Sequence, residues 1–353
     1  LNPDLLGYKG EVYVVDLGGS NLRAARVKLT HSGAELSSDL VEKTMQWQRG
    51  VSFDKEQYLT SIADIIAQIK LNKPIPLAYC FSYPCTNLYN GDATLNKWTK
   101  GIYVPDTEGK SVTQALLSLL KDKHNIEVTG VQIVNDTVAS LLAGLTDNSS
   151  DGFMGLIAGT GFNAAAWMPQ SAVAKLPSSI NLGYIPINFE CGNHAPSYLS
   201  RYDEILDKQS ETPGEQLLEK AAGSMYLSRL FNLIYPDNQI DQGSGAKGLS
   251  KLVESEGIQT ERAQTAIALY QRASQLTAMA IVGTLIVLSR NSHISQLKVV
   301  CEGGMFWSEI TTGKAFVDLT QHYIHQLTNH FRLSTKVKLD RVTIYDLDGK
   351  EIK

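Results

Sequence analysis

The segment that decides the fold is Glu11–Val27, which reads EVYVVDLGGSNLRAARV. Val12–Val15 is an apolar, β-branched run with the length of a strand. Asp16 ends this run, Gly18–Gly19 predicts a tight turn, and Leu22–Val27 predicts a second strand. A carboxylate at a strand end, followed by two glycines and a hydroxyl, suits a hairpin whose backbone amides hold phosphate near a metal. The same pattern also fits an ordinary β-hairpin, so this segment alone leaves both interpretations open.

A second segment repeats this arrangement. Phe153–Met168 reads FMGLIAGTGFNAAAWM: an apolar strand, the turn Gly159–Gly161 and another apolar run. Both turns combine glycines with a hydroxyl, and Asn21 and Asn163 follow them at matching positions. Two such hairpins in one chain predict duplicated halves, each of which lends a turn to one bound nucleotide.

Composition sets the class of protein. The 353 residues suit two domains, and 43% hydrophobic with 19% charged residues is typical of a soluble globular protein. A net charge of -4 gives no overall attraction for nucleic acid or an acidic membrane. We expect neither kind of partner, because no apolar run looks long enough to span a bilayer and the N-terminus has no secretory pattern.

The cysteines indicate a compartment. Cys80, Cys85, Cys191 and Cys301 are scattered, and no two of them form a Cys-x-x-Cys pair. Such spacing favours reduced core thiols over a disulfide framework or a metal site. The expected location is therefore the cytoplasm.

Polar residues stand at the ends of two further predicted strands. Leu77–Phe81 is followed by Ser82–Pro84, at the end where open α/β sheets place ligand contacts. Val131–Val134 is followed by Asn135 and Asp136, and a helical pattern begins there. At this position Asp136 is either a helix N-cap or a general base, and the local pattern alone favours the cap.

The second half adds helices and a third glycine turn. Thr212–Glu215 has the capping-box pattern with proline at the first helical position, so it predicts a helix start, with Glu219 in the early turns. An isolated helical glutamate is ordinarily solvated surface. Thr260–Ser289 predicts a long, central buried helix, and the predicted strand Leu297–Cys301 leads into Gly303–Gly304.

Taken in order, these motifs resemble the hexokinase family, including its bacterial-type hexokinases and glucokinases, within the superfamily that shares the actin and Hsp70 ATPase core. The likeness runs from about Val12 to Leu233 and continues more weakly to about Leu327. It rests on DLGGSNLR from Asp16, FSYP from Phe81, WTKG from Trp98, NDTV from Asn135, GTGFN from Gly159, INFE from Ile187, and the run from Pro213 to Leu227 that includes Glu219.

The resemblance implies that ATP, with Mg²⁺, donates its γ-phosphoryl group to the C6 hydroxyl of glucose or a related hexose. Asp136 is implied as the general base, with Lys100 beside it in the catalytic set, and Asp16 as the residue that orients Mg²⁺ through water. The implied sugar-binding residues are Ser82, Thr99, Lys100, Asn135, Asp136, Asn163, Glu190 and Glu219. The implied nucleotide-binding residues are Asp16, Gly18, Gly19, Ser20, Asn21, Arg23, Gly159, Thr160, Gly161, Gly303 and Gly304.

The chain departs from the family pattern at several places. Phe162 stands where a small residue is common, and Cys191 precedes Gly192 where the family has tryptophan. The segment from Glu302 to Met305 only loosely resembles the adenosine segment, and no closing Gly-Ala-Ala helix is visible after Leu339.

The fold that follows is α/β: two duplicated domains, actin-like or ribonuclease H-like, around a cleft. The smaller is expected over residues 8–135 and the larger over residues 136–339, and residues 340–353 are a candidate to rejoin the small domain. We expect a monomer or a homodimer.

Three alternatives stay open from the sequence. The first is a kinase for mannose, fructose or an amino sugar, although the close Cys-x-Cys cluster of the zinc-binding repressor and kinase relatives is absent. The second is a sugar sensor without turnover, which would have no need of Asp136. The third is an ATP-driven chaperone or filament module, which would leave Lys100, Glu190 and Glu219 unexplained.

Overall fold

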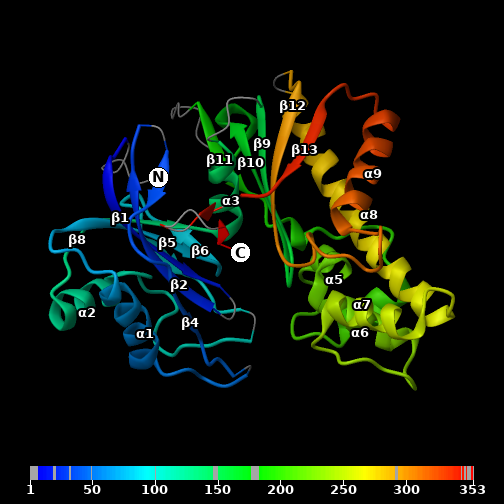
Figure 1. Ribbon diagram of the computed structural model, residues 1–353, viewed down its shortest axis with the longest axis horizontal. Coiled ribbons are helices and arrows are strands. Elements are labelled where there is room, and N and C mark those ends of the chain that lie inside the picture. The colour runs from blue at the N-terminus through cyan, green and yellow to red at the C-terminus, as the bar shows by residue number, and fades with distance from the viewer. Residues whose placement is uncertain are drawn as a thin grey trace. The chain divides into compact units, whose positions relative to one another are not determined.

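The computed structural model describes residues 7–18, 21–31, 33–48, 50–99, 101–145, 150–175, 183–290, 293–342, 344–345, 347 and 351–352. The chain forms two compact units (Figure 1). Unit 1 comprises Leu1–Asp136 with Thr343–Lys353, and unit 2 comprises Thr137–Val342. The predicted division into domains of residues 8–135 and 136–339, with residues 340–353 as a candidate to rejoin the smaller one, stays a prediction.

Unit 1 is built on a six-stranded sheet in the order β3-β2-β1-β5-β8, with β4 also paired to β2. β1 and β2 form the predicted antiparallel hairpin, and β5 and β8 extend the sheet in parallel. Because β1, β5 and β8 run in the same direction, their carboxyl ends meet at one edge of the sheet. The strands are β1 (Gly10–Leu17), β2 (Asn21–Leu29), β3 (Ala34–Leu36), β4 (Val41–Thr44), β5 (Ile75–Phe81) and β8 (Val128–Val134).

Two helices and a small hairpin accompany this sheet in unit 1. Helix α1 begins where the Asp54 carboxylate accepts the N–H of Gln57 at 2.7 Å, which caps the helix. Its buried face carries Ile62, Ile65 and Ile66 at helical spacing, and this face packs into the core of unit 1. These elements are α1 (Lys55–Gln68), α2 (Gln114–His124), β6 (Cys85–Asn87) and β7 (Ala93–Leu95).

Unit 2 repeats the same plan. Its five-stranded sheet has the order β11-β10-β9-β12-β13, in which β9 and β10 form an antiparallel hairpin and β12 joins β9 in parallel. In unit 1, β1, β2 and β5 are arranged in the same way, so the duplication predicted from the two glycine hairpins is confirmed at the level of topology. The strands are β9 (Gly152–Ala158), β10 (Phe162–Pro169), β11 (Tyr184–Asn188), β12 (Gln296–Glu302) and β13 (Lys336–Asp340).

Helices pack around this second sheet. Figure 1 shows α8 and α9 running side by side, and these two helices pack closely along their lengths. The helices are α3 (Asp136–Gly144), η2 (Gln170–Ala172), η3 (Cys191–Asn193), α4 (Arg201–Lys208), α5 (Leu217–Ala222), α6 (Ser224–Ile234), α7 (Gly245–Glu256), α8 (Glu261–Ser289) and α9 (Phe316–His330). Near the C-terminus, β14 (Ile344–Tyr345) pairs with β15 (Glu351–Ile352) in unit 1.

Helix α8 corrects one expectation. By length and composition alone it is long and apolar enough to cross a membrane, whereas no such run was expected from the sequence. Half of its most apolar 18-residue window is buried inside the structure. Its buried side chains, among them Ile267, Tyr270, Ile281 and Leu285, belong to the hydrophobic core of unit 2, so α8 is the central helix that the sequence predicts.

The helix predicted to start at Thr212–Glu215 is also corrected. That segment forms a turn, and α5 begins only at Leu217, after Gln216 adopts a left-handed backbone conformation with φ 54°. The predicted single helix is then interrupted at Gly223, which separates α5 from α6. The interruption has a physical cause, because the N–H of Ser224 leaves the helix and donates to the carbonyl of Gly159 at 2.8 Å.

Candidate active site

Asp16 lies at the carboxyl edge of the unit 1 sheet, between two partners that the strand register supplies. Its antiparallel partner is Arg23, whose Nη1 lies 3.6 Å from the Asp16 Oδ2, and its parallel partner is Cys80 on β5. Burial raises the pKa of Asp16, and the nearby charge of Asp136 raises it further, while hydrogen bonds from Cys80 and Arg23 oppose this. Two carboxylates, Asp16 and Asp136, therefore lie close enough at this edge for their charges to interact.

This carboxylate pair fits a magnesium ion that is held mainly by its nucleotide. Among the residues that the structure describes, no three His, Cys, Asp or Glu side chains gather into a protein-built metal site. Mg²⁺ usually binds one or two carboxylates and completes its coordination with water and substrate phosphates. The role of Asp16 in orienting Mg²⁺ through water stays a prediction.

Asp136 is the first residue of α3. Asn135 is the single residue between the end of β8 and the start of α3. The helix-cap position therefore falls on Asn135, and the half-buried carboxylate of Asp136 belongs to the first helical turn. The N-cap interpretation favoured by the local pattern is thus weakened, and the role of Asp136 as general base stays a prediction.

The hairpin turn between β1 and β2 is closed by the N–H of Gly18, which donates to the carbonyl of Asn21 at 3.0 Å. Arg23 also pairs with Glu42 on β4, with 3.1 Å between its Nη2 and the Glu42 Oε1. Three residues predicted for the site, Gly19, Ser20 and Lys100, lie outside the described residues.

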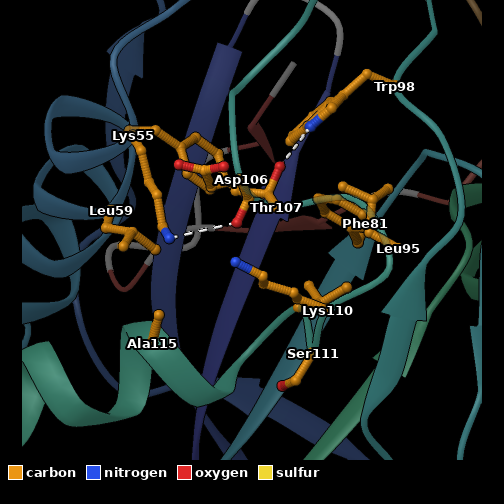
Figure 2. A pocket seen from close by; sticks show the side chains of 12 residues that line it. Lys55, Leu59, Phe81, Leu95, Trp98, Asp106, Thr107, Lys110, Ser111 and Ala115 are labelled. Carbon is orange, nitrogen blue, oxygen red and sulfur yellow. Dashed lines mark hydrogen bonds between the residues drawn. The ribbon is translucent and has the colours of Figure 1, made fainter.

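The sugar-binding loop in unit 1 is anchored through Trp98. Its ring Nε1–H donates to the Thr107 hydroxyl at 2.7 Å (Figure 2). Its backbone N–H donates to the Glu108 carboxylate at 2.7 Å. The ring is 5% exposed and packs edge-on against Tyr83, with 4.6 Å between ring centroids. Trp98 therefore fixes the position of Thr99, the next residue, which is a predicted sugar ligand.

A cavity of about 410 Å³, open to solvent, lies against Trp98 within unit 1. Figure 2 shows Lys55 and Lys110 pointing into it from two sides, and the Lys55 ammonium donates to the backbone carbonyl of Asp106 at 3.3 Å. Ser111 at its border accepts the N–H of Gln114 at 2.8 Å, so the first turn of α2 is already satisfied there. Phe81, the last residue of β5, is one of the residues that line the cavity. Ser82, also predicted to bind sugar, lies directly after β5 and is 8% exposed.

In unit 2 a polar network joins the predicted sugar ligands. Asn163 on β10 donates from Nδ2 to the Asn188 Oδ1 at 2.9 Å, and Asn188 donates from Nδ2 to the Glu190 Oε1 at 2.7 Å. The Glu190 backbone is left-handed, with φ 48°. Glu219 on α5 accepts the backbone N–H of Phe162 at 2.9 Å. Asn163, Glu190 and Glu219 are thus gathered at the start of β10.

The turn between β9 and β10 is tied to the same elements. Its own hydrogen bond runs from the Gly159 N–H to the Gly161 carbonyl at 3.0 Å, and the Met225 N–H of α6 donates to the Thr160 carbonyl at 3.4 Å. A Cβ at Gly161 would lie 2.7 Å from the Glu219 Oε2. The predicted phosphate turn and a predicted sugar ligand are therefore in direct contact.

The third glycine turn packs against the second. Gly303 has φ 116°, and a side chain there would collide with the carbonyl of Ala158. A Cβ at Gly159 would lie 3.1 Å from the Gly303 Cα, whereas Gly304 faces open space. The nucleotide residues predicted at these two turns are neighbours, as a shared nucleotide site requires.

Three functional residues were not predicted. Cys80 becomes a partner of Asp16 only through the register of β1 and β5, which the sequence does not reveal. Asn188 stands inside the INFE motif, two residues before Glu190, but only the structure shows their hydrogen bond. Gly192 is wedged beside Gln216, where a Cβ would lie 2.5 Å from the Gln216 Oε1 and 3.1 Å from the Glu219 Cβ.

All four cysteines are free thiols, and burial raises the pKa of each. The pKa rises to about 12 for Cys85 and for Cys191. The thiol of Cys80 therefore stays protonated and can donate its hydrogen bond to Asp16.

Comparison with known proteins agrees with this geometry. Two family models, both described as hexokinase, match consecutive parts of the chain, residues 7–146 and residues 153–266. The chain belongs to the hexokinase family. The first model carries the sheet edge with Asp16 and Asp136, and the second carries the network around Glu190 and Glu219.

Curated hexokinases are similar to this chain over part of their length. Hexokinase of Emericella nidulans is 30% identical over 245 residues, which is 65% of this chain and 49% of that protein. Hexokinase-1 of Spinacia oleracea is 35% identical over 240 residues, which is 63% of this chain and 47% of that protein. The chain spans about half the length of the curated relatives it matches.

Solved structures share the fold. The hexokinase from Schistosoma mansoni complexed with glucose aligns with a TM-score of 0.73 at 22% identity, over 94% of this chain and 82% of that chain. The ROK hexokinase from Thermus thermophilus aligns with a TM-score of 0.56 at 13% identity, over 94% of this chain and 92% of that chain. The two-domain actin-like hexokinase fold is thereby confirmed. The closer affiliation with bacterial-type members stays a prediction.

Proposed function

We propose that the protein is an ATP-dependent hexokinase that transfers the γ-phosphoryl group of ATP to the C6 hydroxyl of glucose or a related hexose. The observation that carries this proposal is the unit 2 network, in which the carboxylates of Glu190 and Glu219 are both fixed at the start of β10 beside the glycine turn. Paired carboxylates and amides suit sugar recognition, because each can bind adjacent hydroxyl groups.

The chemistry asks for positioning and charge stabilisation more than for covalent help. A sugar hydroxyl is a poor nucleophile, so a base that accepts its proton speeds the attack by about 10²–10⁴-fold. Asp136 is the candidate base, because it stands at the sheet edge beside Asp16. Thr99, held by its neighbour Trp98, and Asn135 are proposed to orient the sugar from unit 1.

The phosphate side is assigned to the glycine turns. Mg²⁺ bound with ATP would neutralise charge on the phosphates, and Asp16 would orient it through water. The turns at Gly18 and Gly159 are closed by their own hydrogen bonds, so each presents a fixed backbone to the nucleotide. Gly303, packed on the second turn, leaves Gly304 exposed to open space on the proposed nucleotide side.

A location in the cytoplasm is part of the same proposal. All four cysteines are free, and a reducing compartment keeps them so. The oligomeric state is proposed to be a monomer or a homodimer, which sedimentation of the purified protein would decide.

A coupled assay tests the proposed reaction. ADP release would be measured with ATP and Mg²⁺ against glucose, mannose, fructose, glucosamine and N-acetylglucosamine, with and without the substitution Asp136→Asn. We expect sugar-dependent ADP release with glucose that the substitution abolishes. Glucose binding without ADP release in the unsubstituted protein would identify a sensor and contradict the proposal, whereas release with a different hexose would correct the substrate.

A further inference from the structure

We propose that Asn188 is a positioning residue for sugar binding, whose amide holds the Glu190 carboxylate in a fixed orientation. This inference rests on the proposed function, because Glu190 is the group through which Asn188 would act. Asn188 ends β11, and its backbone pairs with Ala165 on β10, so it is attached to the sheet and not to the loop it controls.

The direction of the hydrogen bonds is fixed by the backbone. The Oδ1 of Asn163 accepts the N–H of Ala164 at 2.7 Å and the N–H of Cys191 at 3.3 Å, so this atom must be the oxygen. The Nδ2 of Asn163 then faces Asn188 and donates to its Oδ1 at 2.9 Å. The Nδ2 of Asn188 is left to face Glu190, and it donates to the Glu190 Oε1 at 2.7 Å. Turning either amide over would place like atoms against each other.

Glu190 needs such a partner. Its backbone is left-handed, with φ 48° and ψ 44°, a conformation that is unfavourable for a residue with a side chain. The residue is exposed, so packing does not hold the carboxylate. The Glu190 Oε1 accepts the 2.7 Å hydrogen bond from Asn188. Among the described residues, the Asn163 Nδ2 also donates to it, at the longer distance of 3.5 Å. Asn188 is therefore its principal support.

The network also limits what Asn163 can do for a sugar. Both contacts of its oxygen are with backbone N–H groups, and one of its two N–H donors serves Asn188. Asn163 can therefore offer a sugar hydroxyl a donor, while Glu190 supplies the acceptor. This division of roles depends on Asn188, because Asn188 connects the two side chains.

Substitution of Asn188 by aspartate separates this role from simple packing. Asn188→Asp keeps the size of the side chain and the oxygen that accepts from Asn163, but it places a second oxygen against the Glu190 carboxylate. Two carboxyl groups so close share a proton at low pH and repel each other when both are ionised. The other groups nearby are the Cys191 thiol, whose pKa is raised to about 12, and the Glu219 carboxylate on α5. Glucose affinity of this variant should therefore depend on pH.

The experiment measures KM for glucose and kcat between pH 5.5 and 9, together with the Kd for glucose from tryptophan fluorescence. For Asn188→Asp we expect KM to be raised about tenfold or more at pH 8.5, to recover largely at pH 6, and kcat to change less. Asn188→Leu, which cannot donate, should raise KM at every pH. Asn193→Asp is the matched control, because it keeps the oxygen that accepts the Gln216 N–H, and its bond to Glu190 runs from the backbone N–H to the Glu190 carbonyl at 3.0 Å, which the substitution retains.

The outcomes are distinct. A KM for Asn188→Asp that follows the unsubstituted protein at every pH overturns the inference, and so does an Asn193→Asp variant with the same pH dependence. If Asn188→Leu does not fold, the comparison of Asn188→Asp with itself at pH 6 and pH 8.5 still decides. If the unsubstituted protein binds glucose without turnover, the proposed reaction fails, while the Kd series continues to test Asn188. If it binds no hexose, both are overturned.

Discussion

The Glu219 carboxylate accepts a hydrogen bond from the backbone N–H of Phe162 at 2.9 Å. Phe162 is the first residue after the glycine turn Gly159–Gly161, so one hydrogen bond links a predicted sugar ligand to a predicted phosphate turn. A movement of the turn would therefore shift the carboxylate. Binding of the nucleotide at the turn should then influence binding of the sugar, and the reverse. The predictions below use this and neighbouring contacts.

Replacing the candidate base should affect turnover selectively. Asp136→Asn keeps the size of the side chain but cannot accept a proton, so we expect kcat to fall about 100-fold or more while the Kd for glucose changes far less. Steady-state kinetics and tryptophan fluorescence would measure the two quantities. Asp122→Asn, on the exposed surface of α2, is the matched control. Near-normal turnover of Asp136→Asn would remove Asp136 from the mechanism.

Replacing the anchored glutamate should affect binding as well as turnover. Glu219→Gln retains an oxygen that can accept the Phe162 N–H but loses the charge that strengthens bonds to sugar hydroxyls. We expect KM for glucose to rise about tenfold or more and kcat to fall with it. Glu215→Gln, four residues earlier and exposed, should leave both unchanged. A change in kcat alone would contradict a role in holding the substrate before the reaction.

A single methyl group at Gly192 should disturb the same site. The Cβ of Gly192→Ala would lie 2.5 Å from the Gln216 Oε1 and 2.9 Å from the Phe162 carbonyl, so the backbone must shift. Overpacking of this kind costs about 1–3 kcal/mol, which thermal unfolding would show as a lower Tm. Gly283→Ala on α8 is the contrasting control, because its Cβ meets open space and alanine favours a helix. An unchanged Tm for Gly192→Ala would mean that the space around Gly192 can accommodate a methyl group.

Acid should weaken unit 2 through a buried ion pair. Asp203 is 4% exposed, and its carboxylate bonds Arg272 at 3.0 and 2.6 Å. Burial alone would raise its pKa, but the Arg272 and Ser200 hydrogen bonds outweigh burial and lower it. Because the folded pKa lies below the unfolded value of about 3.9, this stabilisation is present above that pH and is lost as pH falls through the folded pKa.

The test of this ion pair is urea unfolding between pH 2.5 and 7. Asp203→Asn should lower the free energy of unfolding by about 3 kcal/mol near pH 7, and the difference from the unsubstituted protein should shrink toward pH 2.5. Glu204→Gln, the exposed neighbour on α4, controls for the change of charge. A difference that stays constant over the whole range would show that the carboxylate's ionisation does not contribute.

The sequence predicts what depends on local pattern. The hairpins around Gly18 and Gly159 follow from glycine turns between apolar runs, and their order along the chain identifies the family. What it cannot predict depends on pairing between distant segments: Cys80 meets Asp16 only because β1 and β5 share a particular parallel register. The helix predicted after Thr212 is interrupted at Gly223 because the next N–H, that of Ser224, bonds to the glycine turn, a tertiary contact that overrides local helix propensity.

The raised pKa of all four thiols has a consequence for metabolism. Oxidants and electrophiles attack the thiolate form of cysteine, and at neutral pH burial keeps Cys80, Cys85, Cys191 and Cys301 in the thiol form. Cys80 stands beside the carboxylate proposed to orient magnesium, where a sulfenic acid would disrupt catalysis. If the proposed function holds, phosphoryl transfer would persist under oxidising conditions, because burial leaves these thiols little thiolate to oxidise.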